Sequence, residues 1–245
     1  MIETVTNSIK TYVNSQVLNQ ETTTELALAT FLAGGYILLT GPTGLGKTHW
    51  ATAFLNTLGP NYKQIQLTED TQYRDEKRHE DFVIAIHDGS FALPPMISDR
   101  FMMKLQVNYP GVAAEKQILQ MHHLGTATNY TSAPICGPDA IAQAKYEVQA
   151  VAVEDSIFNY IISIVETTRR VNAVQTGASI RGSIDLLLAS KAYAAVKGQD
   201  YVSMDDVRSL AMPVLCHRIT LKPDAVREGI QAERIIESIL VGRRY

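Results

Sequence analysis

The chain has 245 residues, of which 46% are hydrophobic and 19% are charged, and its formal net charge is −3. This composition excludes a disordered tail, and the length is enough for one large domain or two small ones. The slight acidic excess gives no support to a basic surface built for nucleic acid. The only cysteines, Cys136 and Cys216, make neither a disulfide framework nor a zinc site, which favours a reducing compartment.

The N-terminal sequence is polar and does not have the pattern of a signal peptide. The longest apolar stretch, residues 26–39, is interrupted by Thr30, Gly34 and Gly35 and is too short to span a bilayer. We therefore expect a cytoplasmic protein that does not insert into a membrane.

Strand and helix signals alternate along the first half of the chain. Residues 36–40 (YILLT) and 82–86 (FVIAI) have no polar face, which is typical of buried parallel strands. This alternation predicts an α/β fold with a parallel sheet and flanking helices. The expected elements are helices over residues 22–33 and 48–59 and strands over residues 36–40, 63–67, 82–86 and 104–107.

The second half, from Val112 onward, has helical patterns and almost no strand signal. Helices are expected over residues 154–169 and 181–196, and Ser203 is the predicted N-cap of a third. A stretch rich in Thr, Gly and Pro separates the halves. We therefore predict an α/β domain over residues 1–125 and an all-helical lid domain over residues 126–245.

A glycine-rich turn lies between the strand at 36–40 and the helix at 48–59. It fits the P-loop pattern G-x-x-x-x-G-K-[ST], in which backbone N–H groups surround phosphates, the lysine reaches the outer phosphates and the hydroxyl ligates Mg²⁺. No guanine-reading Asn-Lys-x-Asp element is present, so ATP with Mg²⁺ is the expected cofactor. The predicted nucleotide-binding residues here are Gly41, Pro42, Thr43, Gly44, Leu45, Gly46, Lys47, Thr48 and His49.

From Val17 onward the chain resembles the MoxR family of AAA+ ATPases. The P-loop alone is generic. The succession of three motifs along the chain is specific to the family: the P-loop, then Asp99-Arg100-Phe101, then Gly177-Ala178-Ser179-Ile180-Arg181. The resembling stretches cover most of residues 17–240. The resemblance implies a hexameric ring that hydrolyses ATP and remodels a client protein, with a von Willebrand factor A domain protein as the usual partner.

The resemblance also implies roles for single residues. Gln20 corresponds to a glutamine near the adenine, and Lys47 and Thr48 to the phosphate and magnesium residues. Arg100 corresponds to the arginine finger, which reaches the γ-phosphate held by the neighbouring subunit. Arg181 corresponds to sensor 2, which couples lid position to nucleotide state. The alternatives are a surface ion pair of Arg100 with Asp99, and a solvated Arg181 at a helix start.

The acidic residues that activate water in this family are missing. The family has roughly 50 more residues between the second strand and the sensor-1 strand, including a Walker B strand that ends in Asp-Glu. Here the polar residues 68–81 connect the two strands, and no apolar run followed by Asp-Glu occurs anywhere. At the sensor-1 position, normally an asparagine, the chain has Asp88.

Three interpretations of this gap stay open. Asp88 follows an apolar strand and would replace the Walker B aspartate as a catalytic residue and a metal ligand, with His87 beside it. Alternatively, the chain is an ATP-binding assembly module that hydrolyses ATP poorly or not at all. In the third interpretation, the chain lacks a segment that the natural protein contains. A P-loop kinase of another family is a further, more distant alternative.

The remaining histidines and cysteines give weaker signals. Adjacent helical positions diverge by about 100°, so His122-His123 is expected to be a solvated helix end rather than a metal site. His217-Arg218 lies near a predicted helix end, where we expect it to face a neighbouring subunit or solvent. Neither cysteine has an activating partner in the sequence, so both are expected to be inert.

Overall fold

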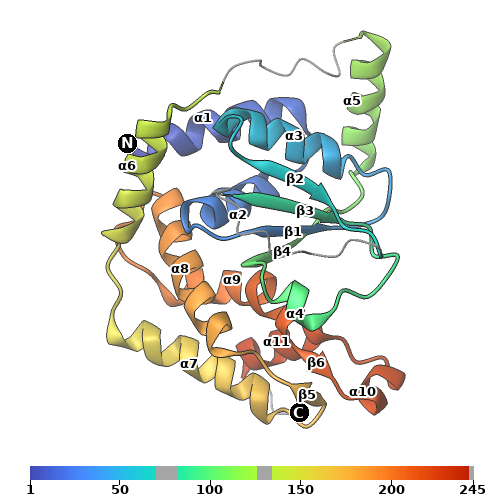
Figure 1. Cartoon of the computed structure of the whole chain (residues 1–245), viewed down its shortest axis with the longest axis vertical. Helices are drawn as coiled ribbons and strands as arrows, with labels where there is room; N and C mark the ends of the chain where they lie inside the picture. Colours follow the sequence, from blue (N-terminus) through green and yellow to red (C-terminus); the bar gives the residue numbers. More distant parts are fainter. Residues whose placement is uncertain (70–81, 126–133, 243–245) are drawn as a thin grey trace.

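The computed structural model describes residues 1–69, 82–125 and 134–242 (Figure 1). Four parallel strands form a sheet in the order β2-β3-β1-β4. Short apolar runs form the two central strands, and the half-exposed β2 lies at one edge, as its alternating sequence predicts. The α/β fold with a parallel sheet is therefore confirmed. The strands are β1 (Ile37–Thr40), β2 (Lys63–Gln66), β3 (Val83–His87) and β4 (Met103–Gln106).

The edge strand β2 pairs directly with β3. Gln64 lies opposite Ile84, and Ile65 lies opposite Ala85, in an unbroken parallel register. The family resemblance leads us to expect a Walker B strand before the sensor-1 strand, to which β3 would correspond. Much of the segment that connects β2 with β3 lies outside the described residues.

One face of the sheet, which we call the P-loop face, is covered by two helices, and the first helix of the chain packs on both of them (Figure 1). This first helix, α1 (Ile2–Gln16), was not predicted from the sequence, although Val5, Ile9 and Val13 recur at every fourth position and are buried. α2 (Glu21–Leu32) and α3 (Lys47–Leu58) confirm the predicted helices. Together they bury Phe31, Trp50, Phe54 and Phe82 in the main core.

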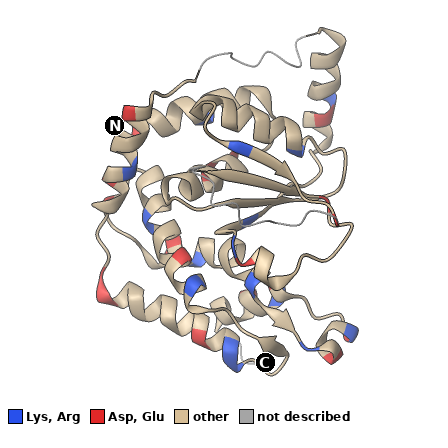
Figure 2. Cartoon of the chain, viewed as in Figure 1, with Lys and Arg blue, Asp and Glu red and all other residues tan. Residues whose placement is uncertain are grey.

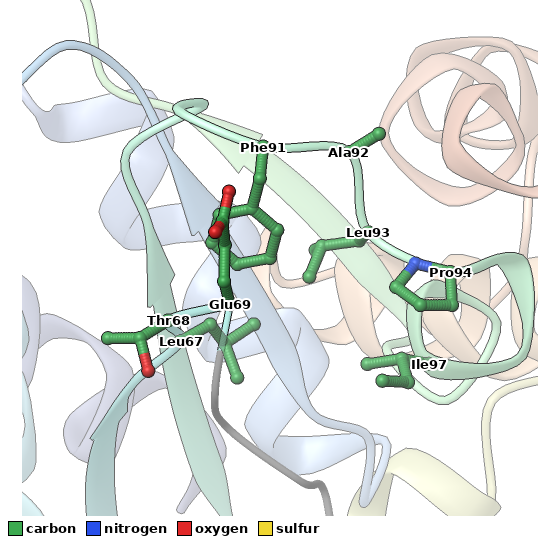
Figure 3. Close-up of a pocket in the computed structure, with 8 residues that line it drawn as sticks. All are labelled: Leu67, Thr68, Glu69, Phe91, Ala92, Leu93, Pro94 and Ile97. Carbon is green, nitrogen blue, oxygen red and sulfur yellow. The ribbon is translucent and has the colours of Figure 1, made fainter.

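The opposite face, which we call the finger face, has a much smaller apolar cluster. Its buried members are Leu38, Leu67, Ala85 and Phe101. Half-buried side chains of residues 91–97 cover them and leave a cavity of about 320 Å³. Figure 3 shows Leu93 and Ile97 pointing across this cavity toward Leu67. The short helix α4 (Pro95–Ser98) ends this covering segment.

The second half of the chain is mainly helical, as predicted. Ser203 caps α9 through a reciprocal bond pattern with Asp206, which confirms the predicted N-cap. The prediction of an all-helical lid needs one correction: β5 and β6 form a small antiparallel pair, too short to give an alternating pattern. The lid elements are α7 (Asp155–Arg170), β5 (Val174–Thr176), α8 (Ile180–Val196), α9 (Met204–Leu215), a 3₁₀ turn η1 (Cys216–Arg218), β6 (Thr220–Leu221), α10 (Pro223–Arg227) and α11 (Ala232–Val241).

Two helices lie between these parts. α5 (Val112–His123) projects beside the nucleotide-binding loop, and α6 (Pro138–Gln149) packs on α1 (Figure 1). The main core also continues from the sheet into α8 and α9. The domain boundary at residue 125 therefore stays a prediction, since α6, assigned to the lid domain, contacts the first helix of the chain.

Acidic and basic positions are interspersed along the described helices rather than gathered on one of them (Figure 2). None of the helices in the described ranges has the length and apolar character needed to cross a membrane.

Candidate nucleotide-binding site

The loop between β1 and α3 has the backbone conformation of a P-loop. Gly41 has φ of +143°, and a Cβ at this position would lie 2.4 Å from the Val107 carbonyl oxygen. Gly46, with φ of +74°, precedes the first residue of α3. Only glycine tolerates both positions without strain, so the sequence permits a sharp turn from strand to helix. Backbone N–H groups at the start of α3 are thereby presented to an anion.

Lys47 is held inside this loop. The residue is 6% exposed, and its Nζ donates to the carbonyl oxygens of Gly41 and Pro42 at 2.6 Å each. In these two bonds the positive charge of Lys47 meets neutral carbonyl oxygens. Phosphate oxygens could take the place of these acceptors and form stronger, charge-assisted hydrogen bonds. Thr48 is exposed in the first turn of α3, where its hydroxyl is accessible to a metal ion.

A mainly apolar cavity of about 360 Å³ lies beside the loop. Gln20, predicted to lie near the adenine, lines it together with Leu45 and His49. The His49 ring is fixed by a contact of Nε2 with the Gln16 carbonyl oxygen at 3.2 Å, and Gln20 accepts a hydrogen bond from Thr23. The other lining residues come from the chain before α2, from the loop after β4 and from α5: Gln16, Val17, Leu18, Asn108, Pro110, Ile118, Met121 and His122.

A second cavity, of about 580 Å³, opens at the carboxyl ends of β1 and β3. Gly41, Pro42 and Asp88 line it together with His87, which lies opposite Thr40 in the sheet. The Asp88 carboxylate accepts hydrogen bonds from the N–H and hydroxyl of Ser90, which lower the pKa of Asp88. The structure therefore brings the predicted residue Asp88 beside the start of the P-loop in ionised form.

Neither Arg100 nor Arg181 lines these two cavities, although Ser98, two residues before Arg100, lines the second. The Arg181 guanidinium is 57% exposed and 3.7 Å from the carboxylate of Asp99, the residue before Arg100. Asp99 therefore contributes to an ion pair with Arg181 of the lid. Arg100 follows the short helix α4, and Arg181 lies in the first turn of α8.

His217 and Arg218 are not directed toward solvent, and the expectation for this pair was wrong. The Arg218 side chain is 1% exposed, and its guanidinium pairs with Asp99 at 3.1 Å and with Asp185 at 2.5 Å. Burial and the adjacent Arg218 charge lower the pKa of His217 to about 3. The sequence carries no local signal of these contacts, because Asp99 and Arg218 are 119 positions apart.

The remaining histidines and cysteines differ in their exposure. His122 and His123 are exposed at the end of α5, and the described residues contain no cluster of three potential metal ligands. Cys136 and Cys216 are buried, and burial raises the pKa of the Cys216 thiol to about 11. Both thiols are therefore protonated at neutral pH and unsuited to nucleophilic chemistry.

Comparison with known proteins agrees with this geometry. A family model described as an AAA lid domain matches residues 166–239. The uncharacterized protein YeaC of Bacillus subtilis is 30% identical over an alignment that covers 94% of this chain and 91% of YeaC. Chaperone MoxR1 of Mycobacterium tuberculosis is 29% identical over 63% of this chain, and protein MoxR of Methylorubrum extorquens is 26% identical over 56%. The chain belongs to the MoxR family of AAA+ ATPases.

The alignments with the two MoxR proteins cover only 42% and 45% of those relatives' own lengths. A crystal structure from Cytophaga hutchinsonii, assigned as an ATPase, has the same fold: the TM-score is 0.84, with 23% identity over 98% of this chain and 94% of the other. The AAA+ fold with a helical lid, expected from the resemblance, is therefore confirmed.

The YeaC alignment also bears on the missing acids. It runs over 292 residues, whereas this MoxR-family chain has 245, so at least 47 positions of the alignment have no counterpart here. This surplus agrees in size with the segment that the resemblance leads us to expect before the sensor-1 strand.

Proposed function

We propose that this MoxR-family chain binds Mg-ATP in its P-loop, turns it over slowly in a homo-oligomeric ring and acts on client proteins in a chaperone-like way. The observation that carries the proposal is the buried Lys47, enclosed by a glycine-rich loop between a parallel strand and a helix. The name of the relative Chaperone MoxR1 supports the chaperone-like part.

The residues beside the loop suit the parts of ATP. The phosphates would lie against the N-terminus of α3 and Lys47, and the base would enter the apolar cavity between Gln20, His49 and α5. Thr48 and Asp88 supply a hydroxyl and an ionised carboxylate, the oxygen ligands that Mg²⁺ prefers. Bound Mg²⁺ would neutralise charge on the transferred phosphoryl group.

In this proposal Arg100 and Arg181 act on the nucleotide of the adjacent subunit. Neither arginine lines the cavities beside the P-loop, and Asp99, the residue before Arg100, lies 3.7 Å from the Arg181 guanidinium. An arginine that stabilises phosphoryl transfer from such a position needs a second subunit. We therefore expect a ring, hexameric by family resemblance, with a von Willebrand factor A domain protein as a candidate partner.

A second candidate function is ATP-dependent assembly without turnover. The observation in its favour is the direct pairing of β2 with β3, together with the absence from the sequence of an apolar run ending in Asp-Glu. Without a glutamate to orient water, Asp88 is the remaining acid at the carboxyl end of β3. This module would still respond to ATP through Lys47 and the two arginines.

Calorimetry with Mg-ATP tests the binding step. We expect Lys47→Ala to weaken ATP affinity by about 100-fold, which is close to 3 kcal/mol, because the charged partner of the outer phosphates is lost. Lys222→Ala, an exposed lysine of the lid, is the matched control. Absence of binding heat in the wild-type chain would refute the proposal.

Steady-state ATPase measurements distinguish ATP hydrolysis in a ring from ATP-dependent assembly without turnover. Turnover that is lost in Arg100→Ala, and restored when Arg100→Ala and Lys47→Ala subunits are mixed, supports hydrolysis with a finger supplied in trans. Tight binding with no turnover supports the assembly module. Turnover that Arg100→Ala leaves unchanged would contradict the role of the finger.

A further inference from the structure

The arginine finger lies between two residues that are both fixed by the lid. Asp99, which precedes Arg100, accepts a bond from Arg218 Nη1 at 3.1 Å. The carbonyl oxygen of Phe101, which follows Arg100, accepts bonds from Arg218 Nη2 at 2.7 Å and from His217 Nε2 at 2.8 Å. Two consecutive residues of η1 thus hold the backbone and side chain on both sides of Arg100.

Further contacts complete this attachment, which we call the finger clamp (Ser98, Asp99, Phe101, Asp185, His217 and Arg218). The Ser98 hydroxyl donates to the His217 carbonyl oxygen at 3.2 Å. Asp185 on α8 pairs with Arg218 at 2.5 Å, so two carboxylates neutralise a guanidinium that is almost fully buried. The clamp therefore pairs the buried charge with two carboxylates, which a buried guanidinium requires to be stable, while its Nε has no partner among the described residues.

The polar bonds of the finger clamp hold a segment that has little apolar packing on the finger face. Phe101 is fully buried, but the finger face has only four buried apolar residues among those that the structure describes. Arg218 belongs to η1, which follows α9 without a break, and α9 packs against α8 and α11 in the lid. A displacement of the lid would therefore pull directly on the residues next to Arg100.

We propose that Arg218 is a positioning residue that fixes the direction of Arg100 and makes the finger move with the lid of its own subunit. The inference rests on the proposed function of Arg100 in trans, which it deepens. The planar fork of arginine is required, because its Nη1 bonds Asp99 while its Nη2 bonds Phe101 and Asp185. The single ammonium of a lysine cannot reproduce this arrangement.

The first test is hydrogen exchange on the full chain, read by mass spectrometry. Arg218→Lys keeps the buried charge, and we expect the amides of residues 99–102 to exchange about tenfold faster. The amides of β1 and α7 should be unchanged, which distinguishes loss of the clamp from general unfolding. Arg227→Lys is the matched control, since Arg227 makes a comparable ion pair with Asp224 on the exposed surface of the lid.

The second test is ATP turnover with the same variants and with Asp99→Asn. We expect Arg218→Lys to lower turnover at saturating ATP at least tenfold, as Arg100→Ala does, while ATP affinity stays within about twofold of the wild type. Mixing Arg218→Lys with Lys47→Ala subunits should restore turnover, because the Lys47→Ala subunits supply intact fingers.

The outcomes separate the inference from the proposed function. Unchanged exchange at residues 99–102, or a loss of turnover that mixing does not restore, would overturn the role of Arg218. If Arg100→Ala leaves turnover unchanged, or the wild type shows none, the proposed hydrolysis with a finger in trans fails. In that case the hydrogen-exchange measurement still decides, without the turnover data, whether Arg218 holds residues 99–102.

Discussion

The P-loop face of the sheet carries the helix that follows the phosphate-binding loop, and the finger face carries the segment that leads to Arg100. On the P-loop face, α1, α2 and α3 bury a continuous core with stacked and edge-on aromatic rings. On the finger face, four buried apolar residues lie under a loop and beside a cavity of about 320 Å³. Polar bonds to the lid hold the end of that loop.

The difference suits the functions that we propose for the two faces. A phosphate-binding loop works best on a rigid support, and dense apolar packing supplies one. A finger that responds to nucleotide in a neighbouring subunit has to follow the lid, and a few directional bonds transmit such movement without fixing the segment to the core. The predictions below test this contrast, from the largest expected effect to the smallest.

Removal of an aromatic ring from the P-loop face should give the largest effect. Phe54 is fully buried, stacks on Trp50 at 5.4 Å between ring centroids and contacts Phe82. Phe54→Ala should lower the free energy of unfolding by about 4 kcal/mol, since it leaves a cavity in a packed core. Urea denaturation measures this loss. Phe158→Ala on the exposed side of α7 is the control, and equal losses in both variants would contradict the contrast.

The clamp predicts a loss of stability in acid. His217 has a pKa of about 3 in the folded chain and an ordinary value near 6.5 when unfolded, so below pH 6.5 protons bind the unfolded state preferentially. Between pH 7 and pH 5 the folded state should lose about 2 kcal/mol from this residue, and nothing above pH 7. Burial raises the pKa of Asp185, which opposes the trend.

His217→Gln isolates the histidine contribution, because glutamine keeps a hydrogen-bond donor without a titrating group. The difference in unfolding free energy between pH 7 and pH 5 should shrink by about 2 kcal/mol relative to the wild type. His122→Gln, at the exposed end of α5, should leave that difference unchanged. If His217→Gln retains the full pH dependence, His217 is not the buried neutral group described here.

Sequence alone could predict the P-loop face and its binding loop, because the signals are local. The run before Gly41 has no polar face, and the glycines and Lys47 define the turn, so β1 and α3 begin within a residue of expectation. The finger clamp could not be predicted. Its partners come from α8, η1 and the residues around α4, and no pattern near Arg218 distinguishes a buried arginine from a solvated one.

Other predictions failed for reasons of length and context. β5 and β6 have three and two residues, too few to show a period. The first helix was detectable, since Val5, Ile9 and Val13 share a face, but the many polar residues between them obscure that apolar stripe. The contribution of Asp88 could not be decided, because it depends on an oligomer and a metal ion that one sequence does not describe.

Asp88→Asn tests whether the carboxyl end of β3 contributes to chemistry. Asparagine is nearly isosteric but lacks the charge that attracts Mg²⁺, so we expect turnover of Mg-ATP to fall about tenfold while ATP affinity changes by less than about threefold. Ser90→Ala, which removes one bond to Asp88, serves as a milder control. Unchanged turnover in Asp88→Asn would exclude Asp88 as a magnesium ligand and would mean that hydrolysis depends on another group.

The smallest effect is expected on the finger face. Leu93 is half-buried beside the cavity shown in Figure 3, so Leu93→Ala removes apolar contacts from a site that is already incompletely packed. The free energy of unfolding should fall by only about 1 kcal/mol, against about 4 kcal/mol for Phe54→Ala. Urea denaturation of both variants at one pH measures the ratio. A loss at Leu93 as large as that at Phe54 would mean that apolar packing, rather than the finger clamp, holds the segment that carries Arg100.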